Sequence, residues 1–468
     1  MTSIVGRQVP VFQPPYAGIG RRSIIFHQRS KEHSMTCPRI VVVGGGAGGL
    51  ELATRLGRTL GKRKRADIIL VDRNPTHIWK PLLHEVAVGA LDTDLDAVSY
   101  QSHARQNGYY FQRGTLTGLD KETRTLTLAP INDEEGKVII GERSLNYDYL
   151  VMAVGSISND FGTPGVRDNC YFLDSPQQAE SFRQAMLSAF LKNAPADNGQ
   201  DGDKELTIAI VGAGATGVEL SAELFNAVEM LHSYRVTGVD RQRLKVHIIE
   251  AADRILPALA ERISSNVHQE LTRLGVQIHT KTMVAKADEH GFETSTGERI
   301  DADLLVWAAG VMAPKFLSEL GLSTRRNNQI EVHQTMQSVD DPHIFAIGDC
   351  AACPQADDKF VPPRAQAAHQ MASTMYKNLV ALINGKEMKP FEYRDLGALV
   401  SLSHFHAAGR LMRGASTRGL FIEGWLARTF YTSLYRMHQQ AIYGTPRMLA
   451  KIVVDRLNHW LRPRLKLH

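Results

Sequence analysis

Short, unbroken apolar runs alternate with longer amphipathic stretches along this chain, and this alternation predicts strands and helices in turn. The first run, 40–43, holds only isoleucine and valine, which is typical of a strand buried on both faces of a parallel sheet. Apolar and small residues follow at helical spacing at Ala53, Leu56 and Leu60, and a second apolar run covers 68–71. The order strand, helix, strand predicts a parallel α/β unit.

The turn between the first strand and the helix is rich in glycine and fits the pattern G-x-G-x-x-G. Its required glycines are Gly44, Gly46 and Gly49. Glycines at these places let the chain turn sharply, let its backbone approach a pyrophosphate, and let the helix pack close to the sheet. The second strand ends at Asp72, whose carboxylate can accept both hydroxyl hydrogens of an adenosine ribose. The unit is therefore predicted to bind a dinucleotide.

A second copy of the same pattern begins with the apolar run 207–211. Its fingerprint glycines are Gly212, Gly214 and Gly217. The next strand ends at Glu250, where a carboxylate accepts the free ribose hydroxyls of NADH and repels the extra phosphate of NADPH. If the nucleotide is a nicotinamide dinucleotide, the second copy is therefore predicted to prefer NADH.

Two further apolar runs end in glycine, the first at Gly155 and the second at Gly310. Each predicts a buried strand whose final glycine lets the chain pass close to a bound nucleotide. A shorter apolar run, 344–347, leads into Gly348 and Asp349. Because the whole pattern occurs twice, the chain is predicted to contain a duplicated dinucleotide-binding domain.

The two glycine fingerprints, the two closing strands and the late Gly-Asp resemble the two-dinucleotide-domain flavoprotein family. This resemblance implies an α/β fold of the glutathione-reductase type, with FAD bound first and NADH second. In that family the late aspartate hydrogen-bonds the ribityl chain of FAD, a role that the motif assigns to Asp349.

The resemblance also predicts how the chain is divided. An FAD-binding domain is expected to be discontinuous, over 37–162 and 311–395, with an NADH-binding domain inserted at 163–310. Residues 396–468 are expected to form a C-terminal membrane-anchoring region. The first 36 residues lie outside the predicted fold. They are expected to be disordered or to result from a start codon assigned upstream of the true one.

Composition agrees with a folded, multidomain protein. The 468 residues are enough for two or three full-sized cores, and 43% hydrophobic with 22% charged residues is ordinary for a folded chain. The formal charge of +5 is small. Basic residues cluster at 61–65 and at the C-terminal end, which indicates that the protein binds an acidic surface and does not read a nucleic acid sequence. No run of 18 apolar residues is present.

The start of the chain leaves two interpretations open. It carries arginines and almost no acid, which fits a transit-like leader. The alternative is an upstream start codon with Met35 as the true beginning. The second is preferred, because Pro10, Pro14 and Pro15 would break an amphipathic targeting helix.

Two stretches carry a closer resemblance, to type II NADH:quinone oxidoreductases. These are 72–87 and 362–370, and the likeness extends over about 37–468. In that family the segment A-Q-x-A-x-Q lines the quinone site beside the flavin, which maps onto Gln366 and Gln370. Their spacing of four places both amides on one face of a helix, with His369 off that face and taken as structural.

The same resemblance implies two further site residues. Glu219 matches a glutamate that sits between nicotinamide and flavin, so it is expected to order the hydride-transfer complex and to help relay protons. From the residues alone, Glu219 could equally be a first-turn acid on the helix dipole. Lys80 matches a residue near the isoalloxazine ring, where a cation would stabilise the reduced flavin, although it could also be a surface residue.

Cysteine usage separates the remaining alternatives. The disulfide-reductase members of the flavoprotein family carry a cysteine pair where this chain has 81–86 without cysteine. Four cysteines in a long chain argue against a disulfide framework, and a lone C-x-x-C cannot make a four-ligand zinc site, so no metal is predicted. One alternative function is a sulfide:quinone oxidoreductase that uses Cys170, Cys350 and Cys353. Another is an NADH-responsive signalling flavoprotein.

The C-terminal end offers a route to a membrane quinone, ubiquinone or menaquinone. From Thr445, apolar residues recur on one helical face and basic and polar residues on the other, ending in Arg462, Arg464 and Lys466. A basic amphipathic helix with a tryptophan suits an anionic membrane surface. The protein is expected to be peripheral on the cytoplasmic side of the cell inner membrane. The aromatic run 421–431 could form a second contact or a homodimer surface.

Overall fold

The computed structural model describes residues 37–192, 205–236, 239–402, 406–411, 420–423, 425–461 and 465. The predicted extension 1–36 and the basic residues Arg462, Arg464 and Lys466 lie outside the described residues.

A five-stranded parallel sheet forms the centre of the first half. Its order is β22-β11-β1-β2-β5, and the strands are β1 (Arg39–Val43), β2 (Asp67–Asp72), β5 (Tyr110–Arg113), β11 (Tyr149–Met152) and β22 (Ile344–Ala346). Residues 40–42 have no exposed surface, as expected for a strand covered on both faces. The predicted strand before Gly348 therefore joins the first sheet from far along the chain.

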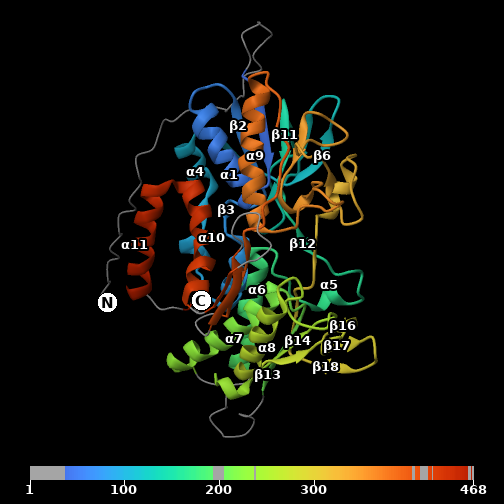
Figure 1. Cartoon of the computed structure of the whole chain (residues 1–468), viewed down its shortest axis with the longest axis vertical. Helices are drawn as coiled ribbons and strands as arrows, with labels where there is room; N and C mark the ends of the chain where they lie inside the picture. Colours follow the sequence, from blue (N-terminus) through green and yellow to red (C-terminus); the bar gives the residue numbers. More distant parts are fainter. Residues whose placement is uncertain are drawn as a thin grey trace, which may run out of the picture. The chain divides into compact units, whose positions relative to one another are not determined.

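Helices from both ends of the chain cover this sheet. They are α1 (Ala47–Leu56), continued by a π-helical turn (Gly57–Gly61), α4 (Tyr100–Asn107) and α9 (Ala365–Ile383). Figure 1 shows α1 and α9 side by side, and these two helices are in contact. The apolar side chains between them and the sheet form one continuous core.

A second parallel sheet repeats the arrangement. Its order is β15-β14-β13-β19, and the strands are β13 (Leu206–Val211), β14 (Leu244–Ile249), β15 (Gln277–His279) and β19 (Leu304–Trp307). The flanking helices are α2 (Leu83–Val88), α6 (Pro176–Lys192), α7 (Ala215–Ser233) and α8 (Glu261–Leu274). These strands and helices share a separate core. The predicted α/β fold with two dinucleotide-binding sheets is confirmed.

Each half also carries a small antiparallel sheet before its closing strand. In the first half this sheet consists of β6 (Leu116–Asp120), β7 (Thr125–Leu128) and β10 (Arg143–Asn146), with the hairpin β8 (Ile131–Asn132) and β9 (Val138–Ile140) inserted. In the second half it consists of β16 (Val284–Asp288), β17 (Gly291–Thr294) and β18 (Arg299–Asp301). The duplication thus extends beyond the glycine turns.

The chain leaves the first sheet and returns to it along paired strands. β12 (Ile157–Ser158) and β20 (Val311–Met312) run antiparallel, with Ile157 opposite Met312 and Ser158 opposite Val311. The two connections between the halves are therefore hydrogen-bonded to each other. The predicted domain limit at 162/163 lies shortly after β12, and the limit at 310/311 lies directly before β20. Both limits stay predictions.

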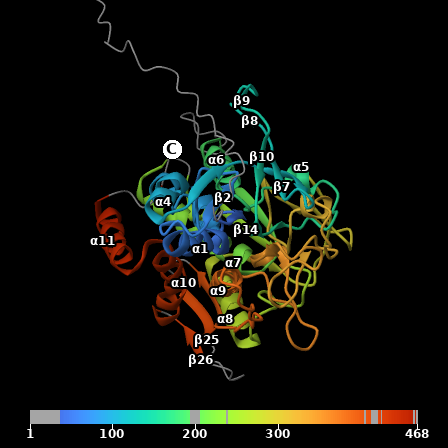
Figure 2. The ribbon, with the colours of Figure 1, turned by 90° about the horizontal axis from the view of Figure 1, so that it is seen from above.

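The C-terminal part begins with a feature that the sequence did not predict. Strands β24 (Gly397–Leu402), β25 (His406–Leu411) and β26 (Leu420–Glu423) form an antiparallel sheet before the two last helices, α10 (Trp425–Tyr443) and α11 (Thr445–Leu461). Figure 2 shows α10 beside α1, with α11 outside it. The side chains of the aromatic run 421–431 lie outside the described residues.

The last helix, α11, begins at Thr445 as predicted and turns its charged face toward the protein. Lys451 Nζ lies 3.0 Å from Asp455 Oδ1 and 3.5 Å from Asp96 Oδ1 of α3 (Thr93–Asp96), and Arg436 of α10 binds Asp455 at 3.2 Å. The opposite face is exposed and apolar: Leu449, Val453, Val454, Leu457, Trp460 and Leu461. Among the helices in the described part of the chain, none has both the length and the apolar character needed to cross a bilayer.

Candidate functional site

Both glycine turns open into one large cavity of about 1330 Å³ between the two sheets. Its lining includes most of the residues that the sequence predicts for the site. From the first half these are Gly44, Gly46, Asp72, Lys80, Gly155, Gly348, Asp349 and Gln366, and from the second half Gly212, Gly214, Glu219, Glu250 and Gly310. Gly49, Gly217 and Gln370 do not line it. The structure therefore brings both predicted dinucleotide sites to one space.

The three glycines of each turn have different structural roles. Gly44 and Gly212 have φ of +104° and +102°, which side-chain-bearing residues rarely adopt. A Cβ on Gly49 would overlap the carbonyl oxygen of Gly44, so this glycine lets the helix pack against its own turn. Gly217 stands in the same relation to Gly212 in the second copy.

The middle glycines face the cavity. A Cβ on Gly46 or Gly214 would meet nothing within 4 Å, so the space in front of each backbone is open to a ligand. Both residues are N-caps, of α1 and α7, and neither helix start has a side-chain cap. The first backbone N–H groups of these helices can therefore bind an anion such as a pyrophosphate, and the residues fit one dinucleotide in each half.

The strand-end acids hold the turns in place. Asp72 Oδ2 accepts a hydrogen bond from the backbone N–H of Gly45 at 2.6 Å, and Glu250 Oε2 accepts one from Ala213 at 2.7 Å. Burial raises the pKa of Asp72. The same contact thus occurs in both halves, and each carboxylate stands at the edge of the cavity where a ribose would bind.

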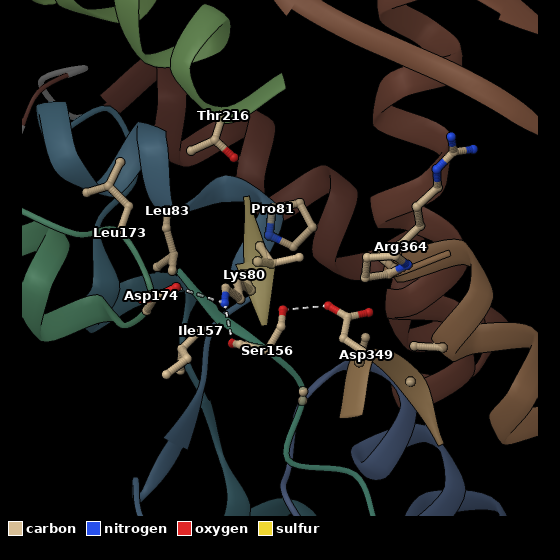
Figure 3. A pocket seen from close by; sticks show the side chains of 18 of the residues that line it. Lys80, Pro81, Leu83, Ser156, Ile157, Leu173, Asp174, Thr216, Asp349 and Arg364 are labelled. Atoms are coloured by element: carbon tan, nitrogen blue, oxygen red, sulfur yellow. Dashed lines mark hydrogen bonds and ion pairs between the residues drawn. The ribbon is translucent and has the colours of Figure 1, made fainter. Parts of the chain in front are cut away.

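A hydrogen-bonded chain crosses the cavity wall at the inner end of the first half (Figure 3). Ser156 Oγ donates to Asp349 Oδ2 at 2.7 Å, and Lys80 Nζ donates to the carbonyl of Ser156 at 2.7 Å. Lys80 also pairs with Asp174 at 3.2 Å. Burial raises the pKa of Asp349. Lys80 is therefore a cation held by two contacts at the cavity edge, with 43% of its side chain exposed.

The cavity also exposes Glu219, which is otherwise buried within the protein. Its Oε1 accepts a hydrogen bond from the backbone N–H of Ser401 at 3.1 Å, and its Oε2 lies 3.6 Å from His84 Nδ1. Burial lowers the pKa of His84 to about 4, so this histidine is neutral near neutral pH. Glu219 is thus held by contacts from α2 and β24, at the side of the cavity that belongs to the second half.

The two predicted quinone-site glutamines share a face of α9, as their spacing predicts, but both amides hold the backbone. Gln366 Nε2 donates to Gly397 O at 2.9 Å and its Oε1 accepts from Leu396 N at 3.1 Å. Gln370 binds both backbone groups of Arg394, at 2.8 and 3.1 Å. The segment that returns over α9 occupies these amides, a long-range contact that helical spacing cannot reveal.

The cysteines are free in the structure. Burial raises the pKa of Cys350 to about 11 and of Cys170 and Cys353 to about 12, so none is a thiolate near neutral pH. The Cys350 thiol donates weak hydrogen bonds to the carbonyl oxygens of Met152 and Ile347. The buried Cys350 and Cys353 thiols fill space around the Gly-Asp turn.

One group at the cavity was missed by sequence reasoning. Glu51 of α1 is fully buried and contacts His369 and His438, and His438 in turn contacts His77. A signal for it existed, because Glu51 follows Gly49 by two residues as Glu219 follows Gly217. His369, taken from the sequence as structural, lines the cavity.

Comparison with known proteins agrees with this architecture. The pyridine nucleotide-disulphide oxidoreductase family matches residues 38–372. A type II NADH:quinone oxidoreductase of Haemophilus influenzae is 47% identical over 441 residues, which cover 92% of this chain and 99% of the relative. The chain belongs to the type II NADH:quinone oxidoreductases. A member from Staphylococcus aureus is 29% identical and covers 79% of this chain and 89% of its own.

Solved structures confirm the fold of the family. NDH2 from Plasmodium falciparum in complex with NADH aligns with a TM-score of 0.77 at 20% identity, over 92% of this chain and all of that chain. The sulfide:quinone oxidoreductase of Aquifex aeolicus aligns with a TM-score of 0.69 at 17% identity, over 91% and 95% of the two chains. Because the fold alone is shared at such identities, the type II sequence match and the protonated thiols decide against the sulfide alternative.

Proposed function

We propose that this chain oxidises NADH and reduces a membrane quinone through FAD. The observation that carries the proposal is the single cavity onto which both dinucleotide cradles and the start of α9 open. FAD, when bound, supplies the chemistry that accepts a hydride and passes on two electrons. The residues of the chain bind, orient and enclose the reactants.

Each half of the cavity supports one part of the reaction. The turn at Gly46 with Asp72 suits the pyrophosphate and ribose of FAD, and the paired Ser156 and Asp349 suit its ribityl chain. The turn at Gly214 with Glu250 suits NADH. Glu219 then stands at the cavity on the NADH side, where it orders the approach of the nicotinamide.

The quinone is expected at the start of α9. Arg364, Gln366 and His369 line the cavity there, together with Gly397 of the returning segment. Gln366 shapes this wall by binding the segment backbone, and its role is to position the wall for a quinone. Ubiquinone and menaquinone both fit this proposal.

Anaerobic mixing tests both half-reactions in order. NADH should bleach the flavin absorbance of the purified protein, and a short-chain quinone should restore it. Bleaching without recovery would contradict the quinone assignment and would favour a signalling flavoprotein.

The exposed apolar face of α11 supports membrane attachment. A helix that places Val453, Leu457 and Trp460 outward while its charged face binds the protein is suited to insert into a lipid surface. We place the protein on the cytoplasmic face of the inner membrane, where NADH is available. Truncation after Gly444 should release it to the soluble fraction and leave NADH oxidation by soluble acceptors intact; retention on membranes would contradict this role.

A further inference from the structure

A buried carboxylate joins three histidines where α1, α9, α10 and β3 (Thr76–His77) meet. Glu51 Oε2 lies 2.6 Å from His369 Nδ1, and Glu51 Oε1 lies 2.8 Å from His438 Nδ1. His438 Nε2 lies 3.0 Å from His77 Nε2. The four side chains form one continuous chain, His369–Glu51–His438–His77, and all of them line the cavity.

The chain is closed to water except at one end. Glu51 and His438 have side chains that are 0% and 2% exposed, whereas the His369 side chain is 23% exposed. The ring of Trp79 lies 4.3 Å from the ring of His438 and covers it. A proton held inside can therefore leave most directly through His369, beside Gln366 at the expected quinone position.

The donor and acceptor atoms of these contacts allow a proton to move along the chain. His77 and His438 face each other through two Nε2 atoms, so one must donate and the other accept, and the direction can reverse. The carboxyl group of Glu51 presents one oxygen to each of two histidines. The ionised carboxylate can therefore accept a proton from His438 on one oxygen and, after the neutral carboxyl group has turned, release that proton to His369.

Burial lowers the pKa of His77 well below its ordinary value, so this histidine is the neutral inner end of the chain. Burial by itself would raise the pKa of Glu51, but hydrogen bonds from His369 and His438 bring it below its ordinary value. Of the groups on α4 that face His77, burial raises the pKa of Tyr100 well above its ordinary value and lowers that of His103 to about 4.

Groups on two other elements also lie near the chain. On α10, burial raises the pKa of Tyr435 to about 12, so its hydroxyl stays protonated near neutral pH. On α1, one turn after Glu51, Arg55 donates to Ser373 of α9 at 2.9 Å.

We propose that His369, Glu51, His438 and His77 store one proton and deliver it to the quinone, with His369 as the donor. The proposal rests on the proposed function. Oxidation of NADH by a quinone consumes one proton: NADH, H⁺ and quinone give NAD⁺ and quinol. Hydride transfer accounts for two electrons and one quinol hydrogen, and the stored proton accounts for the other. The chain is reloaded from solvent after the quinol leaves.

Two variants test the donor path in the holoenzyme. Glu51→Gln keeps the shape of the side chain but cannot carry the proton, and His369→Gln removes the donor at the partly exposed end. Ser373→Ala is the matched control, since it alters the same α1–α9 contact and its hydroxyl bonds only the backbone carbonyl of His369, not a side chain of the proposed proton chain. Flavin reduction by NADH and flavin reoxidation by a short-chain quinone are measured separately by anaerobic rapid mixing, in H₂O and D₂O.

The expected result is specific to reoxidation. Both variants should be reduced by NADH within about twofold of wild type and should be reoxidised at least about a hundredfold more slowly, the low end of what a lost proton donor costs. The solvent isotope effect on reoxidation should rise, and a small weak acid such as formate should restore part of the rate. Ser373→Ala should match wild type.

Two readouts that do not depend on turnover separate proton delivery from a structural role. The thermal midpoint of the holoenzyme should stay near wild type in both variants, and the Kd of a non-reducible quinone analogue, followed by flavin fluorescence, should stay near wild type in Glu51→Gln, whose buried side chain lies behind His369. Slow reoxidation that merely follows weakened analogue binding, without an isotope effect or rescue, would overturn the proposal.

Two further outcomes separate this proposal from the function on which it rests. Variants that reoxidise at the wild-type rate would overturn proton delivery alone. A wild-type protein that NADH reduces and quinone does not reoxidise would overturn the proposed function, and this proposal with it.

Discussion

Glu51 and Glu219 occupy the same place in the two copies of the fold, two residues beyond the last glycine of each turn. Both are buried, and both line the cavity. Their partners differ, because Glu51 meets histidines and Glu219 meets a backbone N–H and a neutral histidine. Duplication thus placed two carboxylates on one cavity, and each is surrounded by a different set of groups.

The glycines of the first turn give a matched pair of substitutions. Gly49→Ala should lower the free energy of unfolding by about 1–3 kcal/mol, because its Cβ overlaps the Gly44 carbonyl oxygen. Gly46→Ala should leave the thermal midpoint of the flavin-free protein near wild type but reduce flavin content, since its Cβ points into the open cradle. Equal loss of stability in both variants would contradict this division of roles.

The carboxylate of Glu250 sets an expectation for cofactor choice. Glu250→Gln removes the charge that repels the phosphate of NADPH, so the ratio of kcat/KM for NADH to that for NADPH should fall about tenfold, or about 1.4 kcal/mol. Steady-state rates with both cofactors measure the ratio. An unchanged ratio would show that another group selects the cofactor.

At the scale of elements, the sequence predicted the features that depend on local patterns and missed those that depend on long-range contacts. The strands and helices that build both cradles follow from apolar runs and glycine spacing, and α11 begins where the sequence predicts it. The use of the Gln366 and Gln370 amides depends on the segment around 394–397, which returns over α9. The two histidine partners of Glu51 come from α9 and α10, which are distant from α1 in the chain, so no spacing rule could assemble them.

The outward face of α11 gives an element-scale prediction. Val453→Asp with Leu457→Asp should abolish flotation with vesicles that contain anionic lipid, because it places charge on the exposed apolar face. The control is Val138→Asp with Ile139→Asp in β9, which changes equally exposed apolar residues elsewhere. If the control lost vesicle binding and the α11 variant kept it, the attachment surface would be β9.

At the scale of the whole molecule, buried histidines couple folding to pH. Burial holds the pKa of His84 near 4, below its ordinary 6.5, so the folded protein binds fewer protons than the unfolded chain between these values. Stability from this site is complete above about pH 6.5 and is lost as pH falls toward 4.

The acid sensitivity can be measured directly. The free energy of unfolding should fall by up to about 3 kcal/mol from His84 alone across that window. His84→Gln should flatten the pH dependence, while His290→Gln, at an exposed position, should leave it unchanged. Parallel curves for wild type and His84→Gln would show that His84 is not the source.

The paired strands β12 and β20 carry a consequence for how such a chain can be assembled. Since Ser158 lies opposite Val311, the ends of everything between them stand about 5 Å apart. A whole second copy could therefore enter a single surface turn of the first without moving the host sheet. By the same geometry, a short linker from Ser158 to Val311 could excise the guest, and the host would then have to cover the apolar residues of α2 that pack in the second core.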